Sequence, residues 1–271
     1  MLWDLAPTRE VPLHFIITPP PQLNVDRALA EGEVIFMTTQ SSALLPPGGQ
    51  RILVIMAHPD DAEFICGGTM ARLAAEGCDI HYLLVTSGNK GSHEVGMTSE
   101  RLAQIREEEQ RHAAAVLGVR EVTFLGYHDG EVEGSLALRR ELVLVVRQWQ
   151  PDVVFGFDPW MRYQIHPDHR AVGQCALDAL ASSRMPMYYP EQLSETMAEH
   201  RVKQVYLFST DQPNHWVDIS DFVNKKVEAL YCHVSQMGNP EIGEFVRQRA
   251  RVAGIEHGYA FAEAFHHLAL R

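Results

Sequence analysis

Two short strings of the sequence combine histidine with aspartate, the side chains from which catalytic metal sites are built. They are Ala57-His58-Pro59-Asp60-Asp61-Ala62-Glu63 and His166-Pro167-Asp168-His169. A catalytic zinc site takes three protein ligands, leaves one position open for water and has a carboxylate to spare as a base. Together the two strings supply imidazole and carboxylate groups in that proportion. The sequence therefore predicts a metal centre that activates water for hydrolysis.

The predicted metal ligands are His58, Asp61 and His169. The first two lie three residues apart where a strand passes into a helix, a spacing that turns both side chains toward one point. Two imidazoles and one carboxylate fit zinc, and iron(II) or cobalt would fit the same donors. A water in the remaining position would be acidified to a pKa near ~7.

Three further groups in the strings are left for proton and charge handling. Asp60, next to the ligands, would act as the general base that takes a proton from the attacking water. His166, as a cation, would stabilise the oxyanion and protonate the leaving amine. Asp168 would hold the ring of His166 in place and raise the pKa of that ring.

From residue 51 onward, apolar runs typical of buried strands alternate with stretches typical of helices. We expect strands over residues 52–56, 80–86, 122–125, 153–157, 205–208 and 216–219. We expect helices over residues 67–76, 99–117, 136–149, 169–181, 222–232 and 241–252. Strands that alternate with helices indicate a parallel sheet with right-handed crossovers. The prediction is a single α/β domain with a Rossmann-like, mostly parallel sheet flanked by helices.

The expected sheet brings the two strings together. Ligands of such sheets bind beyond the carboxyl ends of the strands. The first string directly follows the strand over 52–56, and the second follows the strand over 153–157 after a short loop. Each string alone is typical of a turn or a solvated loop, but two of them at strand ends on one rim favour a metal site.

The first part of the chain has a different character. Residues 1–49 hold a short apolar piece, a run of three prolines at 19–21 and the boundary Pro46-Pro47-Gly48-Gly49. We interpret them as an N-terminal extension that packs on the main domain, residues 50–271, or on a neighbouring subunit. No residue of the extension suggests chemistry.

Composition narrows the class of protein. Acidic residues outnumber basic ones by 35 to 23, for a net charge of -12, which argues against binding to nucleic acid or an anionic membrane. No stretch approaches the ~20 apolar residues of a membrane span, and the charged start of the chain is unlike a signal peptide. The four cysteines are scattered without a CxxC pair, as reduced thiols are. These observations predict a cytoplasmic protein.

The chain resembles the LmbE-like, or PIG-L-type, family of zinc-dependent N-acetylglucosaminide deacetylases over most of residues 51–265. The motifs that carry the resemblance are AHPDDAEFICGGTMARL, IREEEQRHAAAVLGV, FLGYHDGEV, PDVVFGFDPWMRYQIHPDHRAVG, KKVEALYCHVSQM and FAEAF. The segment DPWMRYQIHPDHR and the N-terminal extension are most similar to the diacetylchitobiose deacetylase branch. The resemblance implies removal of an acetyl group from N-acetylglucosamine or a small saccharide such as diacetylchitobiose, in a homo-oligomer that is a trimer or a hexamer.

For the site, the resemblance implies the same ligands, base and oxyanion partner as the residues themselves, and adds Arg106 and Asp129 as substrate contacts. Read from the sequence alone, Arg106 could instead form a surface ion pair on its glutamate-rich helix, and Asp129 could simply form a turn with Gly130. Trp160 and Tyr163 could form an apolar wall for a sugar ring, with core packing as the equal alternative.

Some positions depart from the family pattern. Phe261 stands where many members have tyrosine, with Tyr259 nearby as a substitute for that hydroxyl. His128 replaces a proline before Asp-Gly, and Gln164 stands where some relatives have a tyrosine that stabilises the oxyanion. These changes bear on substrate preference and leave the predicted zinc ligands intact. The pair His266 and His267 near the end of the chain is interpreted as a surface pair.

Two other functions stay open from the sequence. One keeps the fold and reaction but changes the substrate to a glucosaminyl thiol precursor, a thiol conjugate or an antibiotic. The other is a metal- or sugar-binding protein without turnover. The presence of both Asp60 and His166 argues against the second, because a binding site would not require both.

Overall fold

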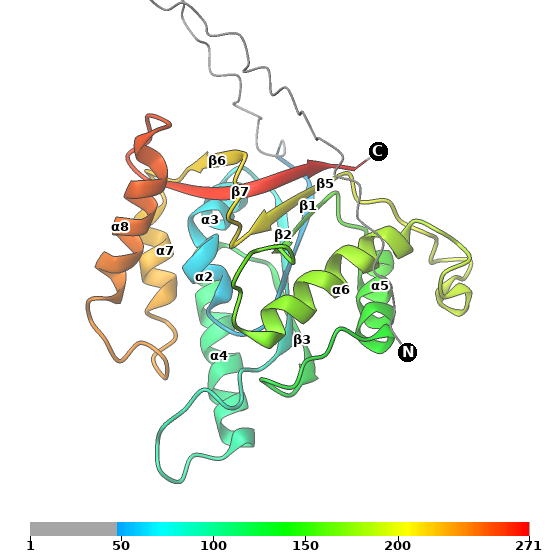
Figure 1. Cartoon of the computed structure of the whole chain (residues 1–271), viewed down its shortest axis with the longest axis horizontal. Coiled ribbons are helices and arrows are strands. Elements are labelled where there is room, and N and C mark those ends of the chain that lie inside the picture. The colour runs from blue at the N-terminus through cyan, green and yellow to red at the C-terminus, as the bar shows by residue number, and fades with distance from the viewer. Residues whose placement is uncertain (1–47, 271) are drawn as a thin grey trace, which may run out of the picture. The chain divides into compact units, whose positions relative to one another are not determined.

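One seven-stranded sheet organises the part of the chain that the structure, a computed structural model, describes: residues 48–270 (Figure 1). The strands are β1 (Arg51–Met56), β2 (Asp79–Thr86), β3 (Glu121–Tyr127), β4 (Val153–Phe157), β5 (Gln204–Phe208), β6 (His215–Asp218) and β7 (Ala262–Ala269). Their order is β3-β2-β1-β4-β5-β7-β6. The first five are parallel, and β7 runs antiparallel to both β5 and β6. The predicted Rossmann-like, mostly parallel sheet is confirmed.

Two groups of helices cover the sheet, as Figure 1 shows. The helices are α2 (Asp61–Ile65), α3 (Gly67–Ala75), α4 (Ser99–Leu117), α5 (Leu136–Trp149), α6 (Pro167–Ser183), α7 (Val223–Leu230) and α8 (Ile242–Ile255), with a short 3-10 turn at Pro190–Gln192. Helices α5 and α6 pack against each other on one side. Helix α7 packs against α2, α3, α4 and α8 on the other. Because both faces are covered, β1 is fully buried from Ile52 to Met56, which explains its uninterrupted apolar run.

The rim of the sheet that carries both strings lies where the strand connections change direction. Strand β1 leads through α3 to β2 on one side of it, while the neighbouring strand β4 leads through α6 to β5 on the other. Connections that leave adjacent parallel strands in opposite directions open a crevice at their carboxyl ends. The first string follows β1 and the second begins at the N-terminus of α6, so both reach this crevice, as expected.

The structure differs from the sequence prediction at the C-terminal edge of the sheet. The last strand, β7, was not predicted, and it inserts antiparallel between β5 and β6. Its sequence, AEAFHHLA, has neither the apolar run of a central strand nor a clean alternation, because its two faces are only partly covered. Helix α6 also begins at Pro167, two residues before the predicted start, because proline suits the first turn of a helix.

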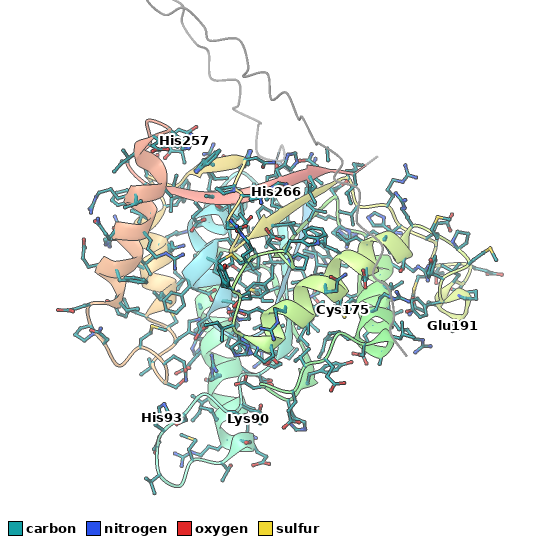
Figure 2. The ribbon with its side chains drawn as sticks, in the orientation of Figure 1. Lys90, His93, Cys175, Glu191, His257 and His266 are labelled. Carbon is teal, nitrogen blue, oxygen red and sulfur yellow. The ribbon has the colours of Figure 1, made fainter. Side chains whose placement is uncertain are left out.

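Three other predictions concern the N-terminal extension, the cysteines and the lack of a membrane span. The proposed extension, residues 1–49, lies outside the described residues except at its last two positions, so this boundary stays a prediction. All four cysteines carry free thiols; Cys175, on α6, is labelled in Figure 2. Among the residues described, no helix is both long and apolar enough to cross a membrane.

Candidate active site

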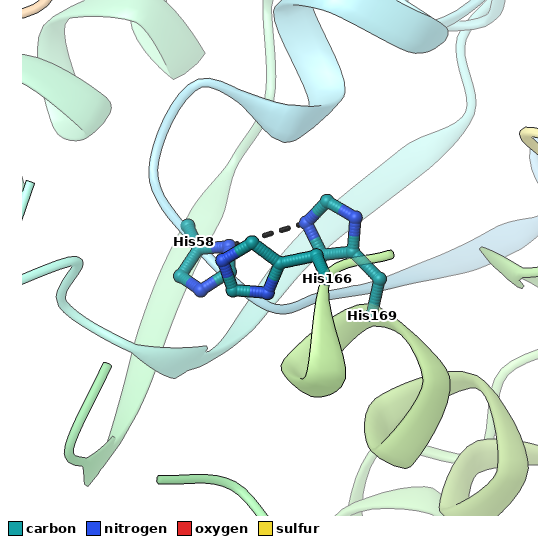
Figure 3. A group of neighbouring side chains, drawn as sticks. All are labelled: His58, His166 and His169. Atoms are coloured by element: carbon teal, nitrogen blue, oxygen red, sulfur yellow. Dashed lines mark hydrogen bonds between the residues drawn. The ribbon is translucent and has the colours of Figure 1, made fainter. Parts of the chain in front are cut away.

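His58 follows the end of β1, and its buried ring lies beside the rings of His166 and His169 (Figure 3). The carboxylate of Asp61 folds back onto this strand end. Its Oδ2 accepts the backbone N–H groups of Ala57 at 3.1 Å and of His58 at 2.8 Å. These two hydrogen bonds tie the first turn of α2 to β1, and they hold the side chains of His58 and Asp61 beside each other.

Two ring nitrogens and the two oxygens of the Asp61 carboxylate form a compact donor triangle of three side chains beyond the end of β1. His58 Nδ1 lies 3.2 Å from His169 Nε2 and 3.7 Å from Asp61 Oδ2. His169 Nε2 lies 3.3 Å from Asp61 Oδ1. In a tetrahedral zinc site with bonds of about 2.0–2.1 Å, ligand atoms are about 3.3 Å apart. The arrangement of these three donors fits such an ion.

Neighbouring donors extend the same cluster. Ring nitrogens of His58, His166 and His169 lie within 4.8 Å of one another, and so do donor atoms of His58, Asp129, His166 and Asp168. His58 and His166 belong to both groups. The described residues therefore contain groups that could hold a metal ion, although neither group includes Asp61, so the predicted ligand set stays a prediction.

The charges of the cluster also suit a cation. Burial by itself would lower the pKa of His58, but hydrogen bonds to Asp129, Asp168 and Asp61 outweigh burial and raise it to about 11. The imidazoles of His169 and His58 in turn hold the pKa of Asp61 well below its ordinary value, against its burial. Three carboxylates thus surround the ring of His58, Asp61 on the side of Nδ1 and Asp129 and Asp168 on the side of Nε2, and together they favour a positive charge on or beside this ring.

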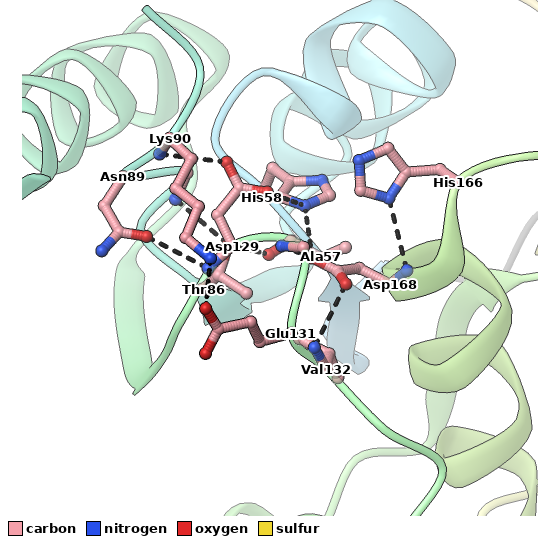
Figure 4. A network of polar contacts seen from close by, with 12 residues as sticks. Ala57, His58, Thr86, Asn89, Lys90, Asp129, Glu131, Val132, His166 and Asp168 are labelled. Carbon is pink, nitrogen blue, oxygen red and sulfur yellow. Dashed lines mark hydrogen bonds and ion pairs between the residues drawn. The ribbon is translucent and has the colours of Figure 1, made fainter.

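Asp168 plays a different part from the one expected. Its carboxylate, fully buried, contacts His58 rather than His166: Oδ2 lies 3.0 Å from His58 Nε2 (Figure 4). It also accepts the backbone N–H groups of Gly130 at 2.7 Å and Val132 at 3.2 Å. The prediction that this carboxylate orients His166 is therefore wrong, because the start of α6 points it toward β1. It fixes a predicted ligand instead.

His166 caps α6 with its ring. Its Nδ1 accepts the backbone N–H of Asp168 at 3.3 Å, which assigns the proton of the neutral ring to Nε2. The ring centre lies 4.6 Å from that of His58 and 4.7 Å from that of His169. Burial, followed by the positive charges on these two histidines, lowers the pKa of His166. The ring is therefore neutral at pH 7 in this structure, where the sequence predicted a cation.

Asp60 sits in the tight turn between β1 and α2 with a left-handed backbone, φ 83°. This conformation costs a residue with a side chain about 1 kcal/mol, so surrounding contacts must hold it. Its Oδ2 accepts a hydrogen bond from Arg106 Nη2 at 3.1 Å. Burial raises the pKa of Asp60 to about 6, and the Arg106 guanidinium opposes that rise.

Arg106 is buried on α4, facing this turn, and is not the surface pair that its glutamate-rich helix allowed. Besides Asp60, its guanidinium donates to the carbonyl oxygens of Pro59 and Gly88, each at 2.8 Å. In this structure Arg106 thus clamps the turn that carries Asp60.

Asp129 reaches the cluster from the loop after β3. Its Oδ1 lies 3.2 Å from His58 Nε2, and its Oδ2 accepts the backbone N–H of Lys90 at 3.3 Å (Figure 4). Lys90 belongs to the loop between β2 and α4, labelled in Figure 2, and its side chain pairs with Glu131. The loops after β2 and β3 are therefore joined at the rim. Asp129 does not only form a turn with Gly130, because it also contacts the ring of His58.

Trp160 and Tyr163 lie on the loop between β4 and α6, and their side chains are 65% and 93% exposed. The alternative that they belong to the core is therefore wrong. Gln164, in the same loop, accepts the backbone N–H of His166 at 3.2 Å through its side chain. The loop is thus tied to the start of α6 while its aromatic rings face outward.

At the C-terminal edge, Phe261 packs partly buried beneath the Arg251 guanidinium, 5.4 Å from the ring centre. His266 and His267 point to opposite faces of β7. The Nδ1 of His266, labelled in Figure 2, lies 2.6 Å from the carbonyl oxygen of Gln212. The ring of His267 stacks on buried Tyr206 at 4.6 Å. The two histidines are half-buried and make separate contacts on opposite faces of the strand, so they do not form a pair.

Sequence reasoning missed three buried polar residues behind the site: Glu63, Gln110 and His233, each 0% exposed. All three stand in stretches that resemble the family, and Glu63 is the last residue of the first string. The available signal was a polar residue at a helical position that faces the core. That signal is visible only once the inward face of each helix is known.

Comparison with known proteins gives the same family that the motifs of the sequence resemble. Residues 53–180 match the family described as PIG-L, GlcNAc-PI de-N-acetylase. The chain is 34% identical over 217 residues to a diacetylchitobiose deacetylase of Thermococcus kodakarensis, covering 79% of this chain and 81% of that one. It is 29% identical to a probable N-acetyl-alpha-D-glucosaminyl L-malate deacetylase 2 of Bacillus anthracis, covering 69% and 81%.

A solved structure agrees in fold. The N,N'-diacetylchitobiose deacetylase of Pyrococcus horikoshii aligns with a TM-score of 0.77 at 33% identity, covering 81% of this chain and 84% of that one. The matched family region contains both strings, and with them every side chain of the donor triangle. On this sequence identity, shared fold and coverage, the chain belongs to the PIG-L family of deacetylases and is an amide hydrolase.

Proposed function

We propose that this chain is a zinc-dependent N-deacetylase of N-acetylglucosamine or of a small saccharide that contains it, such as diacetylchitobiose. The observation that carries the proposal is the donor triangle of His58, Asp61 and His169, with Asp60 next to it in sequence and His166 next to it in space. The substrate class is supported by the names of the relatives, two of which are diacetylchitobiose deacetylases.

Zinc would be held by His58 Nδ1, a carboxylate oxygen of Asp61 and His169 Nε2. When bound there, it would polarise the amide carbonyl and make water a better nucleophile near neutral pH. Asp168 and Asp129 keep the other nitrogen of His58 turned away from these donors, because both carboxylates face Nε2. The site is thereby held in one arrangement before any ligand arrives.

The chain's own residues would move the protons. Asp60, held by Arg106, takes one proton from the attacking water as the new C–O bond forms. The Nε2–H of neutral His166 donates a hydrogen bond to the oxyanion of the tetrahedral intermediate. When the C–N bond breaks, the proton held by Asp60 passes to the leaving nitrogen. The products are acetate and a free amino sugar.

The sugar would lie on the side of the cluster that the outer loops form. Asp129 offers a carboxylate to sugar hydroxyls, and the exposed rings of Trp160 and Tyr163 offer an apolar face. Arg106 would act on the substrate only indirectly, by holding Asp60, because both of its terminal nitrogens already donate hydrogen bonds within the protein.

The test combines metal content with acetate release. Wild-type protein loaded with zinc is expected to release acetate from N-acetylglucosamine or diacetylchitobiose. Asp60→Asn should keep its zinc and lower kcat by about 100-fold or more, the usual contribution of a general base. The matched control is Asp152→Asn, at the opposite end of β4, where the carboxylate pairs with Lys203; its kcat should not change. Full activity of Asp60→Asn would overturn the proposal.

A second substrate class is favoured by other relatives, whose names specify N-acetylglucosaminyl malate and an N-acetylated glucosaminyl inositol. The same assay separates the two classes. The proposed substrate stands if kcat/KM is highest for N-acetylglucosamine or its dimer. A higher value for a glucosaminyl malate, a glucosaminyl inositol or a thiol conjugate would move the enzyme to the alternative class without changing the reaction.

A further inference from the structure

A chain of hydrogen bonds runs from the backbone of Asp60 into the interior of the protein. The N–H of Asp60 donates to Gln110 Oε1 at 3.0 Å. Gln110 Nε2 donates to Glu63 Oε1 at 3.1 Å. The other oxygen of Glu63 lies 3.1 Å from His233 Nε2. The links come from three separate parts of the chain: α2, α4 and the segment that follows α7.

The chemical nature of these groups decides which of them donates and which accepts in each hydrogen bond. An ionised carboxylate only accepts hydrogen bonds, so Glu63 must receive the NH₂ group of Gln110. The amide oxygen of Gln110 is thereby turned toward Asp60. His233 completes the set, because burial alone would lower its pKa but the hydrogen bond to Glu63 raises it. With a proton on Nε2, the ring of His233 donates an N–H to the carboxylate of Glu63.

The orientation of the Gln110 amide matters because its oxygen accepts the backbone N–H of Asp60. With φ at 83°, its N–H points inward to Gln110 rather than along a strand or helix. A backbone N–H left without an acceptor in the interior is costly. The oxygen of Gln110 therefore favours the left-handed turn over an ordinary conformation. In this conformation the carboxylate of Asp60 reaches Arg106, and a change of the backbone at Asp60 would move it.

We propose that Gln110, oriented by Glu63 and His233, is a positioning residue that holds the backbone of Asp60 and so aims the carboxylate of the general base. The inference rests on the proposed function in one respect only, the role of Asp60 as base. Gln110 is fully buried and contacts neither a predicted zinc ligand nor the open side of the crevice, so it acts through Asp60.

The first test is Gln110→Leu, compared with Gln192→Leu. Gln192 is also a buried glutamine: its side chain accepts from the Arg147 guanidinium and donates to the backbone carbonyl oxygen of Arg140, and it lies after α6, in a part of the chain that carries no predicted site residue. Both variants should lose stability. Gln110→Leu alone should lower kcat by about 10- to 100-fold, with KM and zinc content unchanged, as expected when a supporting contact moves a reacting group. An unchanged kcat in Gln110→Leu would overturn the proposal.

The second test exchanges the side chains of positions 110 and 63, and the completed exchange leaves the net charge of the protein unchanged. Gln110→Glu sets two carboxylates against each other, and should lose activity. The double variant Gln110→Glu/Glu63→Gln restores every bond: the new carboxylate accepts from Asp60 and from the amide at position 63, whose oxygen accepts from His233. Its kcat should recover at least tenfold over Gln110→Glu. A double variant that folds as stably as the wild type yet stays as slow as Gln110→Glu would contradict the proposed orientation.

A third measurement does not depend on activity. Amide hydrogen exchange at Asp60, followed by NMR, should be slow in the wild type and in Gln192→Leu, and at least about tenfold faster in Gln110→Leu. Unchanged exchange in Gln110→Leu would overturn the proposal. If the wild type hydrolyses none of the sugars but exchange responds as expected, the proposed function fails while the hold of Gln110 on Asp60 stands.

Discussion

The Nε2 atom of His58 lies 3.0 Å from the buried carboxylate of Asp168, while Nδ1 of the same ring faces His169 and Asp61 (Figure 4). A carboxylate behind a histidine fixes the tautomer of the ring and makes its free nitrogen a stronger ligand. Because Asp168 also accepts two backbone N–H groups of the loop after β3, it joins that loop to His58 at the end of β1.

Asp168→Asn should therefore weaken zinc binding by about 10- to 100-fold, the usual effect of losing such a partner. An amide cannot accept all three hydrogen bonds with the strength of a carboxylate, so the ring of His58 loses its support. Competition with a chelator of known affinity measures the change. Asp178→Asn, on the same helix but bonded to Gln174, is the control. Equal zinc affinity for Asp168→Asn and the wild type would refute this role.

Removal of the metal should lower both activity and stability. Asp61, Asp129 and Asp168 converge on His58, and a bound cation would relieve the repulsion among them. A ligand that binds only the native state at 100 times its Kd adds about 2.7 kcal/mol. Calorimetry should therefore show a lower Tm in a chelator, recovered together with deacetylase activity when zinc is returned. A Tm indifferent to both additions would exclude a metal at this site.

The stability of the protein should fall as the solution becomes acidic, in part through His215. This histidine is buried between the rings of Tyr206 and His267, and burial lowers its pKa to about 4. In the unfolded chain a histidine titrates near ~6.5. Between these two values the unfolded chain binds a proton that the native state does not, so the free energy of unfolding decreases with falling pH, by at most about 1.4 kcal/mol per unit.

His215→Leu should flatten this dependence, because leucine has no proton to gain. Denaturant unfolding between about pH 5 and pH 7, with a chelator present throughout, measures the slope for each variant. His112→Gln, on the exposed face of α4, should leave the slope as it is in the wild type. If His215→Leu and the wild type lose stability in parallel on acidification, the assignment to His215 fails.

A buried ion pair between Lys226 and Glu263 should make a large difference to stability when it is broken from one side. The two side chains are 3% and 4% exposed, and Glu263 also accepts the backbone N–H groups of Gly68 at 3.0 Å and Thr69 at 2.7 Å. Lys226→Met leaves the carboxylate buried without its cation, at a cost of about 3–5 kcal/mol. Urea unfolding measures the loss.

Two further variants test the cause. Lys226→Met/Glu263→Gln removes the uncompensated charge and should be more stable than Lys226→Met alone. Lys203→Met breaks the exposed pair with Asp152 and should change the free energy of unfolding by less than about 1 kcal/mol. A loss in Lys226→Met no greater than in Lys203→Met would mean that the buried pair contributes no more than a surface one.

The sequence predicted the order of the elements well where the pattern is local. The apolar run at residues 52–56 and the amphipathic stretch at 99–117 became β1 and α4 because each needs only its own periodicity to be recognised. Strand β7 escaped prediction because its pairing with β5 and β6 comes from residues far away in the chain. Its own sequence, partly covered on both faces, lacks a strong pattern.

For the site, the sequence by itself determined which residue types are available and, through the two strings at strand ends, that they meet at one rim. Only the tertiary structure decided which group faces which. It turned Asp168 to His58 rather than His166, and Arg106 to Asp60. Spacing along the chain fixes the relative orientation only of side chains that lie a few residues apart. The contacts between strings, and the buried support behind Asp60, depend on how separate helices pack against the sheet.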